Sequence, residues 1–152
     1  MFVGVLDYLE AVLEDTGHET LITRQGGLDI LKVRLEHLGK ADGTALAEIC
    51  AVPFTPDRTE RALLQFFTTF AANLDEKLLD KEIAAYNEMN LTLMCGTIGV
   101  HKGLKQAYHK YTVVLPADEN AAYRQATDSL DLVVGVLNGV FDQAVLIADG
   151  RV

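Results

Sequence analysis

The chain has little of several residue types that would point to a particular chemistry. It has no Trp, one serine and two cysteines among its 152 residues. Two cysteines, Cys50 and Cys95, are too few for the disulfide framework of a small secreted protein, so we expect two reduced and mostly buried thiols. The one serine, Ser129, falls within an expected helix and outside any Gly-x-Ser-x-Gly turn, which argues against a serine hydrolase.

Acidic residues are missing from one long stretch of an otherwise acidic chain. Residues 89–117 contain no Asp or Glu but carry Lys102, Lys105 and Lys110, whereas the formal net charge of the whole chain is −9. A local reversal of sign marks a surface that can meet an acidic partner. The overall acidity argues against general nucleic-acid binding, because contacts with phosphates supply most of that affinity.

Targeting and membrane segments are not expected. Asp7, Glu10 and Glu14 interrupt the apolar residues at the N-terminus, and no basic residue precedes them, unlike in a secretory signal peptide. Polar residues also interrupt the most apolar window, residues 130–148, so we expect no transmembrane helix. We therefore expect a cytoplasmic protein without a membrane partner.

The hydrophobic pattern predicts a single α+β domain over residues 1–152. Helical spacing predicts helices and alternation predicts strands, in the order α-β-β-β-β-α-β-β-α. The expected ranges are 2–15, 18–25, 28–38, 45–54, 63–70, 75–90, 91–98, 107–115 and 118–148, with a turn at 99–103 inside the last hairpin. Short turns between strands require an antiparallel sheet, and we expect the helices to pack on one face of it.

Three glycines of the last hairpin, Gly96, Gly99 and Gly103, invite comparison with a phosphate-binding loop. A P-loop has Lys and then Ser or Thr after its last glycine. Here Lys102 precedes Gly103 and Leu104 follows it. We therefore interpret the three glycines as turn and bulge residues.

Metal-binding and catalytic groups are not expected either. Cys95, His101 and His109 are the one close group of soft ligands, but no spacing among them matches a zinc site. Cys95 falls in an expected apolar strand, where a thiol is inert rather than nucleophilic. The carboxylates at residues 14–15 and 75–82 lie on expected exposed helix faces instead of converging in a cleft. We predict no catalytic residue, no metal and no cofactor.

Two pairs of helical residues have specific structural uses. Asn87 and Asn90 lie at the expected end of the second helix, where one suits a C-terminal cap and the other a hydrogen bond to the following strand. Gly135 and Gly139 form a Gly-x-x-x-Gly pair in the last helix. Such a pair lets another backbone approach closely, either within the fold or across a dimer.

The helix end at residues 86–90, Tyr-Asn-Glu-Met-Asn, is followed by a strand, a turn, a strand and a long closing helix. This arrangement resembles the bacterial YbjN-like proteins, with their Asn-x-x-Asn helix end and their type III secretion chaperone-like fold. The expected strand at residues 63–70 and the basic hairpin depart from the family pattern. The resemblance implies a non-enzymatic protein, because secretion chaperones bind effector segments as homodimers and YbjN-like members are linked to regulation.

We therefore expect a non-enzymatic protein-binding or regulatory module, chaperone-like and homodimeric, that binds an acidic protein segment. The candidate contact residues are His101, Lys102, Lys105, Tyr108, His109 and Lys110. One alternative is a small-molecule-binding domain or weak enzyme, with a pocket between sheet and helices anchored by Tyr108, His109 or Tyr111. A second is that the basic hairpin pairs with an acidic helix of its own fold or of a dimer mate.

Overall fold

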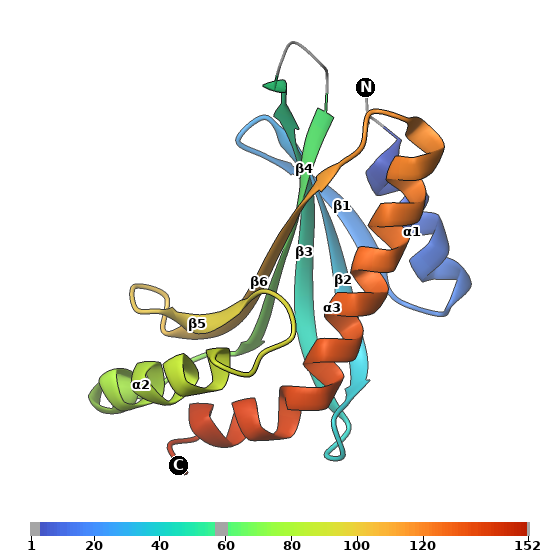
Figure 1. Ribbon diagram of the computed structural model, residues 1–152. Helices are drawn as coiled ribbons and strands as arrows, with labels where there is room; N and C mark the ends of the chain where they lie inside the picture. The colour runs from blue at the N-terminus through green and yellow to red at the C-terminus, as the bar shows by residue number, and fades with distance from the viewer. Residues whose placement is uncertain (1–3, 57–60, 152) are drawn as a thin grey trace.

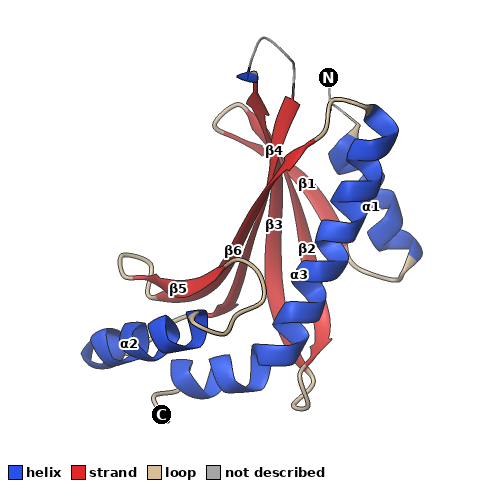
Figure 2. Cartoon of the chain, viewed as in Figure 1, coloured by secondary structure: helices blue, strands red, loops and turns tan. Residues whose placement is uncertain are grey.

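Six antiparallel strands and a layer of helices make up the protein in the computed structural model, which describes residues 4–56 and 61–151 (Figure 1). The elements in chain order are α1 (Val5–Asp15), β1 (Thr20–Gln25), β2 (Leu28–Leu38), β3 (Gly43–Phe54), β4 (Arg61–Ala71), the 3₁₀ helix η2 (Glu76–Leu78), α2 (Leu79–Asn90), β5 (Thr97–His101), β6 (Gln106–Leu115) and α3 (Glu119–Ala148). The predicted α+β class and the predicted order of helices and strands are confirmed. Figure 2 shows the helices gathered on one side of the sheet.

The sheet has the strand order β1-β2-β3-β4-β6-β5, and every neighbouring pair is antiparallel. The strand predicted from residue 18 begins at Thr20 and forms one edge of the sheet. The apolar strand predicted at 45–54 is β3, in the interior of the sheet. The first helix was expected to begin at residue 2, and residues 2 and 3 lie outside the described residues.

The predicted strand at residues 91–98 is wrong in its bounds, and so is the turn at 99–103. The structure has a loop over residues 91–96, and β5 runs from Thr97 to His101. The side chain of Asn90 explains the shift, because its Nδ2 donates to the carbonyl of Ile98 and its Oδ1 accepts from the amide of Ile98, both at 2.9 Å. One amide side chain thereby pairs with β5 as a neighbouring strand would, and the expected bond from this helix end to the strand is confirmed.

The hydrophobic core lies between the sheet and the helices. Burial alternates without a break along β4, where Leu64, Phe66 and Phe70 face the helices. The helix α3 covers this face with a buried stripe at helical spacing. Asp118 caps the first turn of α3, because its side chain accepts a hydrogen bond from the amide of Ala121 at 2.8 Å. The buried residues of α3 are Ala122, Ala126, Ser129, Leu130, Val133, Leu137, Phe141, Ala144 and Ile147.

Side-chain contacts at two places hold α3 against the rest of the fold. Near the start of α3, the ring of Tyr123 stacks on Tyr8 of α1, with 4.6 Å between the ring centroids. Further along α3, Asn138 Oδ1 accepts from the amide of Gly39 at 2.9 Å, and Asp142 accepts from the amide of Lys40 at 2.9 Å. These bonds tie the β2–β3 turn to the helix.

The helix α3 is the one helix of residues 4–56 and 61–151 that is long and apolar enough to cross a membrane by length and composition alone. A core helix of a globular domain meets the same criterion. In this fold the buried stripe of α3 packs on strands β2, β4 and β6 and on the other two helices.

Candidate functional site: the uncovered face of the sheet

One face of the sheet carries no helix. The side chains that point away from the core form this surface, which we call the open face; no described helix packs on it. Alternating residues of the strands build it because successive side chains of a strand point to opposite sides. Its central members are Ile30, Lys32, Arg34, Leu46, Glu48, Cys50, Leu63, Gln65, Phe67, Thr69, Tyr108, Lys110, Thr112 and Val114.

An aromatic pair lies near the middle of the open face. The rings of Phe67 and Tyr108 stack with centroids 4.8 Å apart and an angle of 17° between their planes. Tyr108 pairs in register with Gly99 on β5, and a Cβ at that glycine would lie 3.1 Å from the tyrosine hydroxyl oxygen. The missing side chain of Gly99 therefore leaves room for the tyrosine ring. Stacked aromatic residues of this kind supply large and rigid contact area to an incoming chain.

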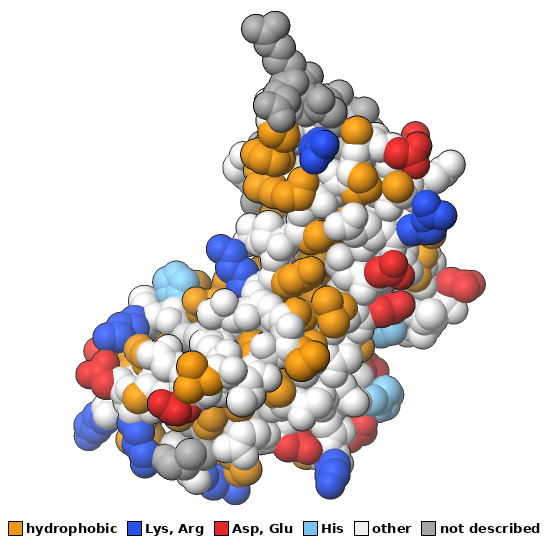
Figure 3. Space-filling model, viewed as in Figure 1, with side chains coloured by type: hydrophobic (Ala, Val, Ile, Leu, Met, Phe, Trp, Pro, Cys, Tyr) orange, Lys and Arg blue, Asp and Glu red, His pale blue; other side chains and the backbone are white. Residues whose placement is uncertain are grey.

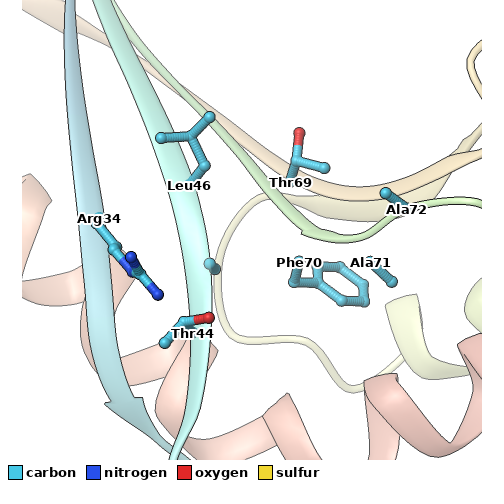
Figure 4. Close-up of a pocket in the computed structure, with 8 residues that line it drawn as sticks. Arg34, Thr44, Leu46, Thr69, Phe70, Ala71 and Ala72 are labelled. Carbon is cyan, nitrogen blue, oxygen red and sulfur yellow. The ribbon is translucent and has the colours of Figure 1, made fainter.

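A shallow hollow of about 340 Å³ adjoins this pair, at the ends of β2, β3 and β4. Figure 4 shows Leu46 and Thr69 on the same side of the sheet, with Phe70 on the opposite side, toward the helices. Leu46 is 43% exposed, although it lies in an interior strand of the sheet. The guanidinium of Arg34 lies at the rim of the hollow. The hollow can accept an apolar side chain beside a cation.

The open face is basic in a chain that is acidic overall. Its strands present four cations, Lys32, Arg34, Arg61 and Lys110, against the two acids Glu36 and Glu48. Lys32 lies 4.0 Å from Glu48, and Arg34 lies 3.7 Å from Glu36. Lys110 makes no ion pair with the described residues.

The candidate residues chosen from the sequence fall on different surfaces. Tyr108 and Lys110 lie on the open face. Lys102 Nζ lies 3.1 Å from Asp80 Oδ1 of α2, and Lys105 Nζ lies 3.5 Å from Glu76 Oε2 of η2. Two of the three lysines thus pair with acids of the same chain, as one of the alternatives predicted for the hairpin. All four side chains are exposed, so each pair contributes little, about 0–1 kcal/mol.

The two histidines of the hairpin have structural partners. His101 lies at the end of β5, and its Nδ1 accepts from the amide of Leu104 at 3.1 Å, which holds the β5–β6 turn. His109 is fully buried on the helix side of β6, and its Nε2 donates to the carbonyl of Cys95 at 2.9 Å. Burial lowers the pKa of His109, and the hydrogen bond to Cys95 offsets part of that effect. His109 is therefore separated from the open face by the sheet itself.

The part of the chain that the structure describes shows no cluster of metal ligands, and its two thiols are half-buried. No cluster of three or more His, Cys, Asp or Glu able to hold a metal ion occurs among residues 4–56 and 61–151. Cys50 and Cys95 are unpaired and half-buried, and burial raises the pKa of both thiols, which keeps them protonated and poorly nucleophilic. The space between sheet and helices is filled by large buried residues such as Phe66, Leu137 and Tyr86.

The sequence analysis missed most of the open face. It identified Tyr108 and Lys110 by their place in the acid-free stretch, but not Phe67, Leu46 or Arg34. The alternation of residues 28–38 puts Lys32 and Arg34 on one side of a strand, and this signal could have identified them. Knowing that the same side continues through Leu46, Phe67 and Tyr108 required the register of strands distant in the sequence.

Comparisons with known proteins do not assign the chain to a family. No protein-family model matches it, and a search of curated proteins finds no match either.

Proposed function

We propose that this protein is a non-enzymatic, cytoplasmic protein-binding module that captures an acidic, partly apolar segment of another protein on the open face. The single observation that carries the proposal is the uncovered sheet surface on which the Phe67–Tyr108 stack lies among four cations and two acids. A helix layer covers the other face, so this half-buried aromatic pair has no packing role between layers.

Charge favours an acidic segment over a neutral one. The whole chain carries −9, so a basic surface on it is a local exception that orients an approaching acidic chain. Arg34 and Lys110 stand on different strands, with Leu46, Phe67 and Tyr108 between or beside them. A segment that alternates acidic and apolar residues matches this pattern of cations around an apolar centre.

The homodimer implied by the resemblance to secretion chaperones is a second part of the proposal. Strands β1 and β5 are the two edges of the sheet. Light scattering checks the dimer, because one chain has a mass of 16.6 kDa and a dimer has twice that mass.

A synthetic acidic peptide, in which Glu alternates with Leu and Phe, tests the open face by fluorescence anisotropy. Lys110→Glu and Tyr108→Ser should each weaken binding at least about tenfold, or 1.4 kcal/mol. Lys102→Glu is the matched control, because it changes the same charge on the same hairpin but lies beside Asp80 of α2. Equal losses for Lys110→Glu and Lys102→Glu would show attraction by net charge alone and would refute a site on the open face.

A further inference from the structure

A second exposed apolar surface lies on the helix side of the molecule, between α3 and the end of α2. Two adjoining hollows of about 460 and 510 Å³ share Met89, Thr92, Gly139 and Val140, and together they form what we call the α2–α3 groove. Figure 1 shows that α3 changes direction in its C-terminal third and runs toward α2. In Figure 3 hydrophobic side chains are exposed along α3 on this side.

Two large apolar residues that line the α2–α3 groove are exposed. Met94, in the loop after α2, is 86% exposed, and Leu132 of α3 is 43% exposed. Leu91, in the same loop as Met94, is 77% exposed. Large apolar side chains gathered in this way mark an interaction surface rather than isolated surface residues. Methionine suits such a surface because its flexible side chain adapts to the shape of a bound partner.

The glycine pair of α3 lines this groove and packs against no other element of the fold. A Cβ added to Gly135 or to Gly139 would meet no atom within 4 Å. The first expectation for this pair, that it lets another backbone of the same fold approach closely, is therefore wrong. Glycine in a helix interior lowers helix propensity relative to alanine. The pair therefore leaves a smooth strip of backbone against which an external helix can pack closely.

Charge selects the kind of helix that fits. The charged residues lining the α2–α3 groove are Glu88 and Asp131, and no lysine or arginine lines it. From residue 125 to residue 150 the chain has four aspartates and no cation. A second copy of this chain would bring more acid, because α1 has no Lys or Arg and α2 and α3 have one each. The complement of the groove is an apolar helix face flanked by positive charges.

We infer that the α2–α3 groove binds a cationic amphipathic helix of a partner protein, with the apolar face of that helix against Met89, Gly139 and Val140 and its cations beside Glu88 and Asp131. This is the helix-in-groove mode of recognition, in which apolar residues at helical spacing anchor the ligand. The site is separate from the open face, since the sheet lies between the two, and it does not depend on the function proposed for that face.

The test uses a synthetic peptide of about 15 residues, with Leu on one face and Lys on the other. Isothermal titration calorimetry measures its binding to the full chain, beside a scrambled peptide of the same composition. Gly139→Leu is the decisive variant: it fills the groove, and it should fold because the added side chain meets open space and raises helix propensity. Asp131→Lys changes the charge of the rim. Asp15→Lys, at an exposed position of α1, is the control for net charge.

We expect the amphipathic peptide to bind the protein at least about tenfold more tightly than the scrambled peptide. Gly139→Leu and Asp131→Lys should each remove most of that difference, whereas Asp15→Lys should keep it. Equal binding of the two peptides, or full binding to a folded Gly139→Leu protein, would overturn the inference. A dimer that Gly139→Leu dissociates, together with no peptide binding, would also overturn it and assign the groove to a second copy.

Discussion

Glu82 is a buried carboxylate for which the structure provides no compensation, and replacing it should stabilise the protein. Its side chain is on α2 and only 1% exposed, and neither carboxylate oxygen has a hydrogen-bond partner among the described residues. Burial raises the pKa of Glu82, and the nearby carboxylates of Asp75 and Asp149 raise it further. Tyr86 lies one turn along the helix, but its hydroxyl donates to the carbonyl of Ala144 at 2.8 Å.

The size of the effect follows from the cost of an unpaired polar group. Leaving a buried acceptor unsatisfied costs about 1–3 kcal/mol, and more when the group is charged. We expect Glu82→Met, which keeps the chain length and a high helix propensity, to raise the free energy of unfolding at pH 7.5 by about 1–3 kcal/mol. In a domain of this size that corresponds to about 2–4 °C in Tm for each kcal/mol.

The dependence on pH separates charge from packing. A carboxyl whose pKa is raised in the folded state holds its proton more tightly there than in the unfolded state. The free energy of unfolding therefore falls as pH rises from 4.5, the pKa of the unfolded state, through the higher pKa of the folded state. The advantage of Glu82→Met should therefore be largest at neutral pH and shrink near pH 4.5. Urea denaturation at several pH values measures it, with Glu88→Met as the exposed control on the same helix. Destabilisation by Glu82→Met, or an advantage independent of pH, would refute this account of Glu82.

The remaining predictions concern the hairpin and the helix that delivers it. Because burial lowers the pKa of His109 below its usual 6.5, the stability of the wild-type protein should fall as pH drops below 6.5. In thermal melts, His109→Leu should flatten this decline between pH 7.5 and pH 5. An unchanged slope would contradict the role given to His109. Asn90→Ala loses both hydrogen bonds to Ile98 and should lower the free energy of unfolding by about 1–3 kcal/mol in urea denaturation. Asn87→Ala, at an exposed position of the same helix, should lower it by less than about 0.5 kcal/mol. Equal losses would contradict the strand-like role of Asn90.

The sequence predicted the architecture well where one element carries its own periodic pattern. The ranges of α3 and β2 were predicted from local patterns, because helical spacing and strand alternation depend on neighbours within a few residues. The start of β5 was missed because it is set by the side chain of Asn90, eight positions before Ile98, and apolar residues 91–94 look like a strand without that bond.

The candidate site was less predictable, because it depends on which residues the register brings together. The lysines of the acid-free stretch lie on two different surfaces. Lys102 forms an ion pair with Asp80 of α2, whereas Lys110 lies on the open face. The expectation that the carboxylates of residues 75–82 lie on exposed helix faces is wrong for Glu82, which is buried. It occupies the same helical turn as exposed acids, and its burial follows from the way the end of α3 packs beside α2.

The measurement that tests the central claim most directly is a methyl NMR titration of the protein with the acidic peptide. Leu46, Leu63 and Val114 report on the open face, whereas Leu64 and Leu35 report on the buried side of the same strands. The account predicts saturable shifts of the first three methyl groups and small shifts of the other two. Shifts confined to the helix side, or none at peptide concentrations that saturate the anisotropy signal, would contradict it.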